Sequence, residues 1–220
     1  MKLAALALSL ALLAAFAQET YDPQKHPWMK WKPGSFVRYR MTTEMAGQKQ
    51  EGEITYTLSE VTASGYALKV KAQMMGMNQE KQEQESVPVK VGTERLKVRD
   101  KEYACTIWMS KGKRGDFPSE TRFWTTDGVS FPLKTALKVE GEEAFEMVAV
   151  SVSEEVTVAG KTYGAVMLSG KMKTAGGEAE VTTWMSDQVP GGALRMETRM
   201  QVQGATVPSR LEAVEIVANK

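Results

Sequence analysis

Cysteine and histidine are almost absent from this chain of 220 residues, which carries one of each, Cys105 and His26. A single cysteine excludes an intramolecular disulfide, and zinc sites need clustered His and Cys ligands that the chain lacks. Nucleophilic catalysis by serine or cysteine needs a base, and His26 stands beside Pro27 in an aperiodic segment. We therefore predict no catalytic residue, no metal and no cofactor, and we expect a protein that is not an enzyme.

Net charge and long apolar runs are also lacking. The formal charge is +1, from 28 basic and 27 acidic residues, and it falls to zero when Lys2 is removed. A nucleic-acid-binding protein needs a basic surplus to replace counterions on phosphates, so no nucleic-acid partner is expected. The longest apolar run, Leu3–Leu13, is shorter than the roughly 20 residues of a membrane-spanning helix. No stable membrane anchor is expected.

The first 17 residues have the three regions of a secretory signal peptide. Lys2 precedes the apolar run, and Ala15-Phe16-Ala17 supplies small residues at a cleavage site. Cleavage is predicted after Ala17. Because Gln18 follows the cut where a lipoprotein would have cysteine, no lipid anchor is implied. The mature protein is expected to be exported, to the periplasm or the extracellular space.

Two stretches of the chain, Glu94 to Val139 and Glu154 to Arg199, match each other without a gap at a spacing of 60 residues. The identical pairs include Lys101 and Lys161, Tyr103 and Tyr163, Lys111 and Lys171, Lys113 and Lys173, Glu120 and Glu180, Trp124 and Trp184, Asp127 and Asp187, and Val129 and Val189. A match through turns as well as strands indicates that one supersecondary unit is used twice. Cys105 falls opposite Ala165, which favours a small buried residue over a reactive thiol.

From Ser35 onward the hydrophobic period is two. Val37 and Tyr39 alternate with Arg38 and Arg40, a pattern typical of half-buried strands. Turn residues separate further runs of this kind, and each repeat copy reads as a four-stranded meander. Residues 135–147 contain Ala, Leu and Glu, which favour helix, but we predict strand there. The predicted fold class is therefore an all-β antiparallel meander sheet with an internal four-strand repeat.

The expected organisation follows from these boundaries. Residues 34–220 are expected to form one domain, and the protein is expected to be a monomer. The segments are a signal peptide at 1–17, an extended arm containing Trp28 and Trp31 at 18–33, β-hairpins at 34–93, repeat copy 1 at 94–153, and repeat copy 2 with a C-terminal strand at 154–220.

The segment Trp184–Gly192 ends a strand, turns on Pro190 and two glycines, and re-enters a strand. With Thr42–Gln48 and Lys32–Gly34, it resembles a set of uncharacterised exported bacterial proteins that share a Trp-x-Ser-Asp-x-Val-Pro-Gly-Gly hairpin. That hairpin in turn looks like part of the outer-membrane lipoprotein-carrier superfamily, LolA and LolB-like. This resemblance implies a strongly curved antiparallel sheet, an incomplete barrel that shelters acyl chains.

Two short motifs have ordinary interpretations. Arg114-Gly115-Asp116 matches the integrin-binding tripeptide, but Thr174-Ala175-Gly176 replaces it in the second copy, so we interpret it as a solvated turn. The methionines of Met74–Met77 would suit copper(I), but no histidine or cysteine accompanies them, and filler around a hairpin turn is the preferred interpretation.

Three functions stay open. Strands that are apolar on both faces favour a non-catalytic carrier or binding protein for an apolar ligand, a lipid or acyl chain. The alternatives are a structural or protein-interaction module of the cell envelope without a small-molecule ligand, and a hydrolase that acts through carboxylates. The ligand-binding candidates are aromatic and methionine residues of the repeat, for which core packing is the alternative role: Trp124, Trp184, Tyr103, Tyr163, Met167 and Met196.

Overall fold

The computed structural model describes residues 20–45, 47–74, 77–174, 177–202 and 204–220, so the predicted signal peptide and residues 75–76 lie outside it. In this part of the chain a short 3-10 helix, η2 (Pro23–Lys25), precedes thirteen strands. The strands are β1 (Phe36–Met45), β2 (Gln48–Thr62), β3 (Gly65–Met74), β4 (Met77–Ser86), β5 (Val89–Val98), β6 (Lys101–Arg114), β7 (Phe117–Thr125), β8 (Lys134–Val139), β9 (Glu142–Val158), β10 (Lys161–Thr174), β11 (Gly177–Met185), β12 (Ala193–Val202) and β13 (Ala205–Val217). Across these ranges no helix has the length and hydropathy needed to cross a bilayer.

All thirteen strands of the described residues belong to one antiparallel sheet, which confirms the predicted fold class. The alternation in β1 places Val37 and Tyr39 in the interior, because burying them removes apolar area from water, while Arg38 and Arg40 stay more exposed. Residues 135–147 form β8 and the start of β9, so the strand prediction there is confirmed.

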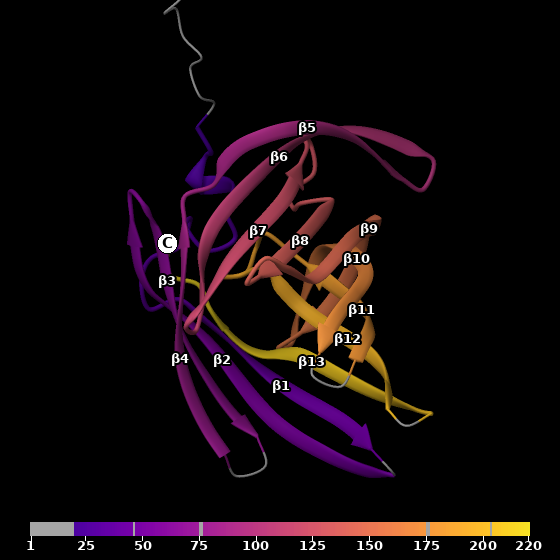
Figure 1. The fold of residues 1–220 in the computed structure, drawn as a ribbon. Helices are drawn as coiled ribbons and strands as arrows, with labels where there is room; N and C mark the ends of the chain where they lie inside the picture. The colour runs from indigo at the N-terminus through magenta and orange to yellow at the C-terminus, as the bar shows by residue number, and fades with distance from the viewer. Residues whose placement is uncertain (1–19, 46, 75–76, 175–176, 203) are drawn as a thin grey trace, which may run out of the picture.

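The sheet curls until β4, at one edge, pairs with β6, the strand next to the other edge (Figure 1). β6 pairs with β5 along Lys101–Met109, and its last three residues, Gly112–Arg114, pair with Glu83–Glu85 of β4. We call this short β4–β6 pairing the seam. Within the described chain, twelve strands therefore form a closed ring, and β5 lies outside it as an extension of β6.

The strand boundaries reproduce the 60-residue repeat. β6 and β10 begin at equivalent positions, and β7 and β11 coincide over their whole length. Pairing registers agree as well, because Thr106 faces Thr125 in the first copy as Val166 faces Met185 in the second. Each copy opens on a turn with positive φ, at Arg99 (54°) and Ala159 (48°). The repeat is thus a structural unit of the sheet.

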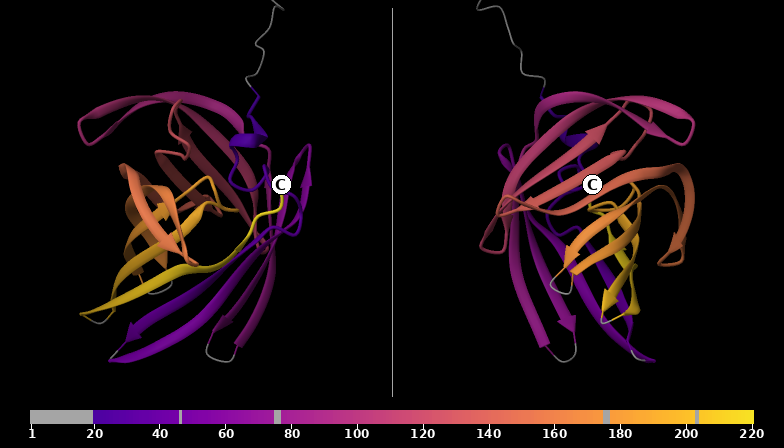
Figure 2. Two further views of the ribbon diagram at one scale, coloured as in Figure 1. Left: turned by 180° about the vertical axis from the view of Figure 1, so that it is seen from behind. Right: turned by 45° about the vertical axis from the view of Figure 1, so that its right-hand side comes forward.

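The residues before β1 cross the interior of the ring. We call residues 20–33 the arm; its ribbon lies between the β3–β4 side and the β5–β7 side in the left view of Figure 2. Trp28 and Trp31 pack with Leu58 and Leu68 of β2 and β3, while Tyr21 packs with aromatic rings of β6 and β7. Both tryptophans are buried, so the arm packs on the sheet through aromatic side chains.

Candidate functional site

Two glycines of the Trp184–Gly192 segment contact aromatic rings, and the first of them, Gly191, contacts the arm. Gly191 has a φ of +73°, and a Cβ there would lie 2.5 Å from the Trp28 ring. The Gly191 N–H donates to the Pro27 carbonyl at 3.0 Å, so backbone and ring dock on the same residue. A Cβ on Gly192 would in turn meet the Phe131 ring at 2.3 Å. These two glycines are needed because aromatic rings lie against their backbone.

Between the arm and the inner wall of β6 lies a cavity of about 510 Å³, which we call the arm cavity. Ala104, Thr106 and Trp108 of β6 line one side, and the 126–132 loop lines another. The Trp108 indole N–H donates to the Thr125 hydroxyl at 2.9 Å, which satisfies its polar atom and leaves the ring face as lining. Phe131 adds a second aromatic wall.

Charged groups surround the arm cavity on its arm side. Lys25 lies 3.8 Å from Asp127, and Lys30 lies 3.8 Å from Asp187. Burial lowers the pKa of Lys30, although Asp187 opposes that shift. Because Asp127 and Asp187 occupy equivalent positions of the repeat, both copies direct a carboxylate toward a lysine of the arm. The cavity therefore combines aromatic walls with a charged border.

His26 stabilises the turn of the arm through hydrogen bonds to its backbone. Its Nδ1 accepts hydrogen bonds from the backbone N–H groups of Trp28 (3.1 Å) and Met29 (3.2 Å). Its ring lies 4.9 Å from that of Tyr66. Burial lowers the pKa of His26 to about 4, although the nearby Glu85 acts in the opposite direction. The imidazole is therefore neutral at pH 7, and its Nδ1 is free to accept.

Acidification through the ordinary histidine range is expected to destabilise the protein through His26. The unfolded chain binds a proton near the usual histidine pKa of 6.5 and the folded chain only near 4, so stability is lost as the pH falls between these values. The free energy of unfolding should drop by roughly 2–3 kcal/mol between about pH 7.5 and about pH 4.5. Urea unfolding at a series of pH values measures this change in the free energy of unfolding.

The matched variant for this experiment is His26→Asn, whose side-chain oxygen can replace Nδ1 as acceptor but does not titrate. Its stability should stay nearly flat over the same pH window. Equal pH dependence in the two proteins would assign the effect to carboxylates instead. The pKa of Glu85 is lowered, because Arg114 and its hydrogen bonds outweigh burial, so its own contribution is lost at still lower pH.

The second candidate site is a buried ionic group at the seam, which we call the seam cluster. Glu83 and Glu85 of β4 are 5% and 8% exposed, and Arg114 of β6 donates to both carboxylates. Glu85 Oε1 accepts from Arg114 Nη2 and Thr121 Oγ1, both at 2.7 Å. Its Oε2 accepts from the Tyr66 hydroxyl at 2.6 Å. Both oxygens of Glu85 are thus occupied.

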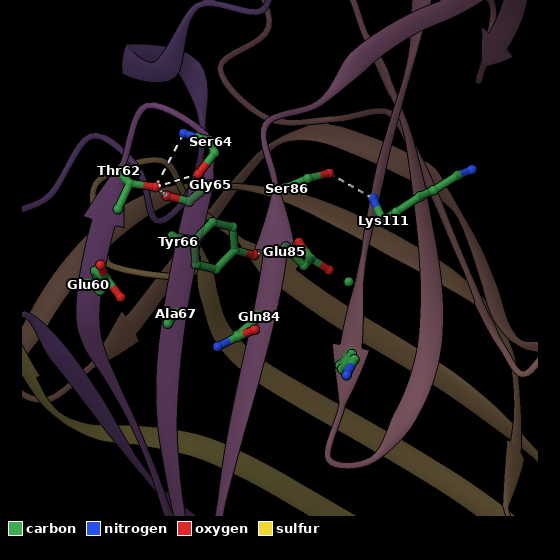
Figure 3. Close-up of a pocket in the computed structure, with 12 residues that line it drawn as sticks. Glu60, Thr62, Ser64, Gly65, Tyr66, Ala67, Gln84, Glu85, Ser86 and Lys111 are labelled. Atoms are coloured by element: carbon green, nitrogen blue, oxygen red, sulfur yellow. Dashed lines mark hydrogen bonds between the residues drawn. The ribbon is translucent and has the colours of Figure 1, made fainter.

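Figure 3 shows how the seam cluster reaches a cleft of about 500 Å³. The Tyr66 ring points from β3 toward Glu85, and Ser86 accepts a hydrogen bond from the Lys111 backbone N–H at 3.1 Å. The lining includes Glu60 and Lys111, so this cleft is polar and charged. The raised pKa of Tyr66, caused by burial and then by Glu85, keeps its hydroxyl protonated as a donor.

The six ligand-binding candidates from the sequence fall into separate places. Trp124, Tyr103 and Met196 belong to one apolar cluster, and Tyr163 and Trp184 to another. Met167 lies between two register shifts of the β9–β10 pairing. None of the six is among the residues that line the arm cavity. As ligand contacts they remain predictions.

Sequence reasoning misses the residues of the seam cluster. The sequence alone favours a solvated turn at Arg114, but its side chain is 27% exposed and turns inward onto two buried carboxylates. Only Gly115 and Asp116 form the turn. The available signal is the period-two spacing of Glu83 and Glu85 in a polar strand, which places both on one face. Their burial depends on β6 lying beside them.

Comparison with known proteins gives little beyond this geometry. No protein-family model matches the chain, and no curated protein matches it. A crystal structure from Vibrio parahaemolyticus, described as an outer membrane lipoprotein-sorting protein domain, covers 89% of this chain and 88% of its own, with 8% sequence identity and a TM-score of 0.38. A likeness at that level carries no argument, so the fold stands on the strand pairing itself.

Proposed function

We propose that the protein is an exported, monomeric, non-catalytic binding or carrier protein for an apolar ligand, a lipid or acyl chain, that binds in the arm cavity. The observation that carries this proposal is the cavity itself. Its volume of about 510 Å³ lies within the roughly 300–1,000 Å³ of small-molecule sites. Trp108 and Phe131 offer apolar contact, and the charged border near Lys25 and Lys30 suits a polar end group.

The second candidate, a structural or protein-interaction module without a small-molecule ligand, is supported by a different observation. The arm already contributes buried side chains to the interior, among them Tyr21, Met29 and Trp31. In that case the arm cavity holds only water. The two candidates differ in one measurable respect, because a carrier isolated from its host brings ligand with it.

A carboxylate-dependent hydrolase is the third candidate, and the seam cluster bears on it. Glu83 and Glu85 converge, as that chemistry requires, but hydrogen bonds and ion pairs occupy both oxygens of Glu85. The lowered pKa of Glu85, where Arg114 and hydrogen bonds outweigh burial, is the reverse of what a general acid needs. The arrangement supports a structural role for the cluster.

Filling the arm cavity should abolish binding. Thr106→Trp places a large ring from β6 into the cavity, whereas Thr57→Trp makes the same change at another half-buried strand threonine outside it. Dansyl-undecanoic acid fluorescence should show binding to the wild type and to Thr57→Trp, and a loss of more than about tenfold in affinity for Thr106→Trp.

Native mass spectrometry of protein purified from its host provides the independent check. Bound species should leave the protein on organic extraction, and Thr106→Trp should arrive without them. A wild-type protein that carries no ligand and binds no fatty-acid probe would favour the structural module. Equal binding by the two tryptophan variants would move the site away from the arm cavity.

A further inference from the structure

The seam is the least extensive junction of the ring among the described residues. β4 pairs with β3 along its whole length, from Gly65–Ser86 to Met74–Met77. On its other edge, as far as the described residues show, it meets β6 only through Glu83–Glu85. Within the described chain, residues 77–82 of that edge have no partner strand. If the three residue pairs between β4 and β6 separated, the unpaired edge of β4 would simply become longer by three residues.

Side chains, rather than a long ladder of backbone hydrogen bonds, fasten the seam. Arg114 of β6 donates to Glu83 and Glu85 of β4, and Thr121 of β7 donates to Glu85. Lys81 reaches Glu83 from the surface at 3.0 Å. A short pairing closed by polar groups can separate as a unit, because water can solvate the same groups once they part.

The two strands also touch at the backbone. A Cβ on Gly112 would lie 1.9 Å from the Gln84 carbonyl oxygen, so only glycine permits the observed approach of β6 to β4. On the other side of β4, a Cβ on Gly65 would lie 2.1 Å from the Glu85 carbonyl. The seam thus depends on close contact at one position of β6, which a single methyl group can disturb.

The seam and the arm cavity share the inner wall of β6. Along this strand, Ala104, Thr106 and Trp108 line the cavity, and Ser110 and Arg114, at the same phase of the alternation, face Glu85. The layer between the two is aromatic, formed by Tyr21 with Trp108 and Phe123. Separation of β4 from β6 would therefore uncover the underside of the arm next to the cavity.

We propose that the ring opens at the seam, by parting of Glu83–Glu85 from Gly112–Arg114, and that this opening is the route by which the ligand enters and leaves the arm cavity. The second half rests on the proposed function. The first half concerns the protein alone and can be measured without ligand.

A disulfide across the seam tests both halves. Gln84 and Lys113 face each other in the β4–β6 register, and directly paired strand residues lie within the roughly 4.4–6.8 Å Cα separation of disulfides. The variant is Gln84→Cys with Lys113→Cys, made with Cys105→Ala to remove the native thiol. The control is Lys171→Cys with Glu180→Cys in the same background, because these residues face each other between β10 and β11.

Hydrogen exchange should show that peptides containing residues 83–85 and 112–114 exchange more than about tenfold faster than β1–β13 peptides in the reduced protein. Oxidation should remove that difference and slow dissociation of dansyl-undecanoic acid by more than about tenfold. The oxidised control should change neither rate. Seam peptides protected as strongly as β1–β13 peptides, or probe dissociation unaffected by the seam disulfide, would overturn the proposal.

A glycine pair gives the opposite perturbation. Gly112→Ala should accelerate both hydrogen exchange at the seam and dissociation of the probe. Gly164→Ala should change neither rate, since a Cβ at Gly164 meets no atom within 4 Å. Should Gly112→Ala fail to fold, the disulfide still decides. If the protein binds no probe, the proposed function fails, but hydrogen exchange at the seam still shows whether the ring opens there. Slow exchange at the seam would contradict the opening itself.

Discussion

Replacing Arg114 with methionine is expected to lower the free energy of unfolding by about 3–5 kcal/mol, the usual cost of leaving buried charges without their partner. The change removes the guanidinium from Glu83 and Glu85, which are almost fully buried. Burial acts to lower the pKa of Arg114, but these two carboxylates outweigh it and raise that pKa, so the arginine stays charged throughout the accessible pH range. Urea unfolding followed by circular dichroism measures the loss.

Two further variants identify the cause of that loss. Arg122→Met removes an arginine that is 45% exposed and bonded to Glu120 at 2.9 Å, and it should cost less than about 1 kcal/mol, as surface ion pairs do. The triple variant Glu83→Gln, Glu85→Gln, Arg114→Met carries no buried charge and should recover most of the lost stability. If the triple variant is as unstable as Arg114→Met, packing of the arginine stem would explain the effect instead.

Truncating Trp31 to alanine is expected to cost about 3–5 kcal/mol, because it leaves a large cavity where the arm packs on β2 and β3. Trp31 is 5% exposed and belongs to a cluster with Leu58 and Leu68. Its indole N–H donates to the Pro27 carbonyl at 2.9 Å, so the variant also removes one of the two hydrogen bonds that this carbonyl accepts. Thermal unfolding followed by circular dichroism avoids the change in tryptophan fluorescence.

The matched control is Phe117→Ala, which truncates an aromatic residue that is 51% exposed next to the β6–β7 turn. A loss of no more than about 0.5 kcal/mol is expected there. If Trp31→Ala and Phe117→Ala lower stability equally little, packing of the arm on β2 and β3 contributes little to the stability of the protein.

The strands and their duplication are predictable from the sequence because both are local properties. Alternation of apolar and polar residues depends on the two-residue period of a strand, and an ungapped spacing of 60 fixes equivalent turns. The ambiguous stretch at 135–147 shows the limit of composition. Its helix-forming residues adopt strand because the neighbours on both sides, β7 and β10, supply pairing partners and a surface to cover.

The sites are less predictable. Local sequence identifies Gly191 and Gly192 only as turn residues, and nothing in it shows that Trp28 and Phe131 rest on them. Trp108 is not among the sequence candidates, because its cavity exists only once the arm lies opposite β6. The residues that form each site are far apart in the chain, and the periodicity of the sequence does not show which distant residues come into contact.

By itself the sequence determined an all-β chain and a repeated meander, because both follow from the chemistry of neighbouring residues. Tertiary structure alone decided that the sheet closes into a ring, that Glu83, Glu85 and Arg114 fasten the closure, and that the arm leaves a cavity on the wall of β6. The physical reason is that curvature accumulates over many strands. Where the two ends of the sheet meet depends on the summed twist and bulges of all of them.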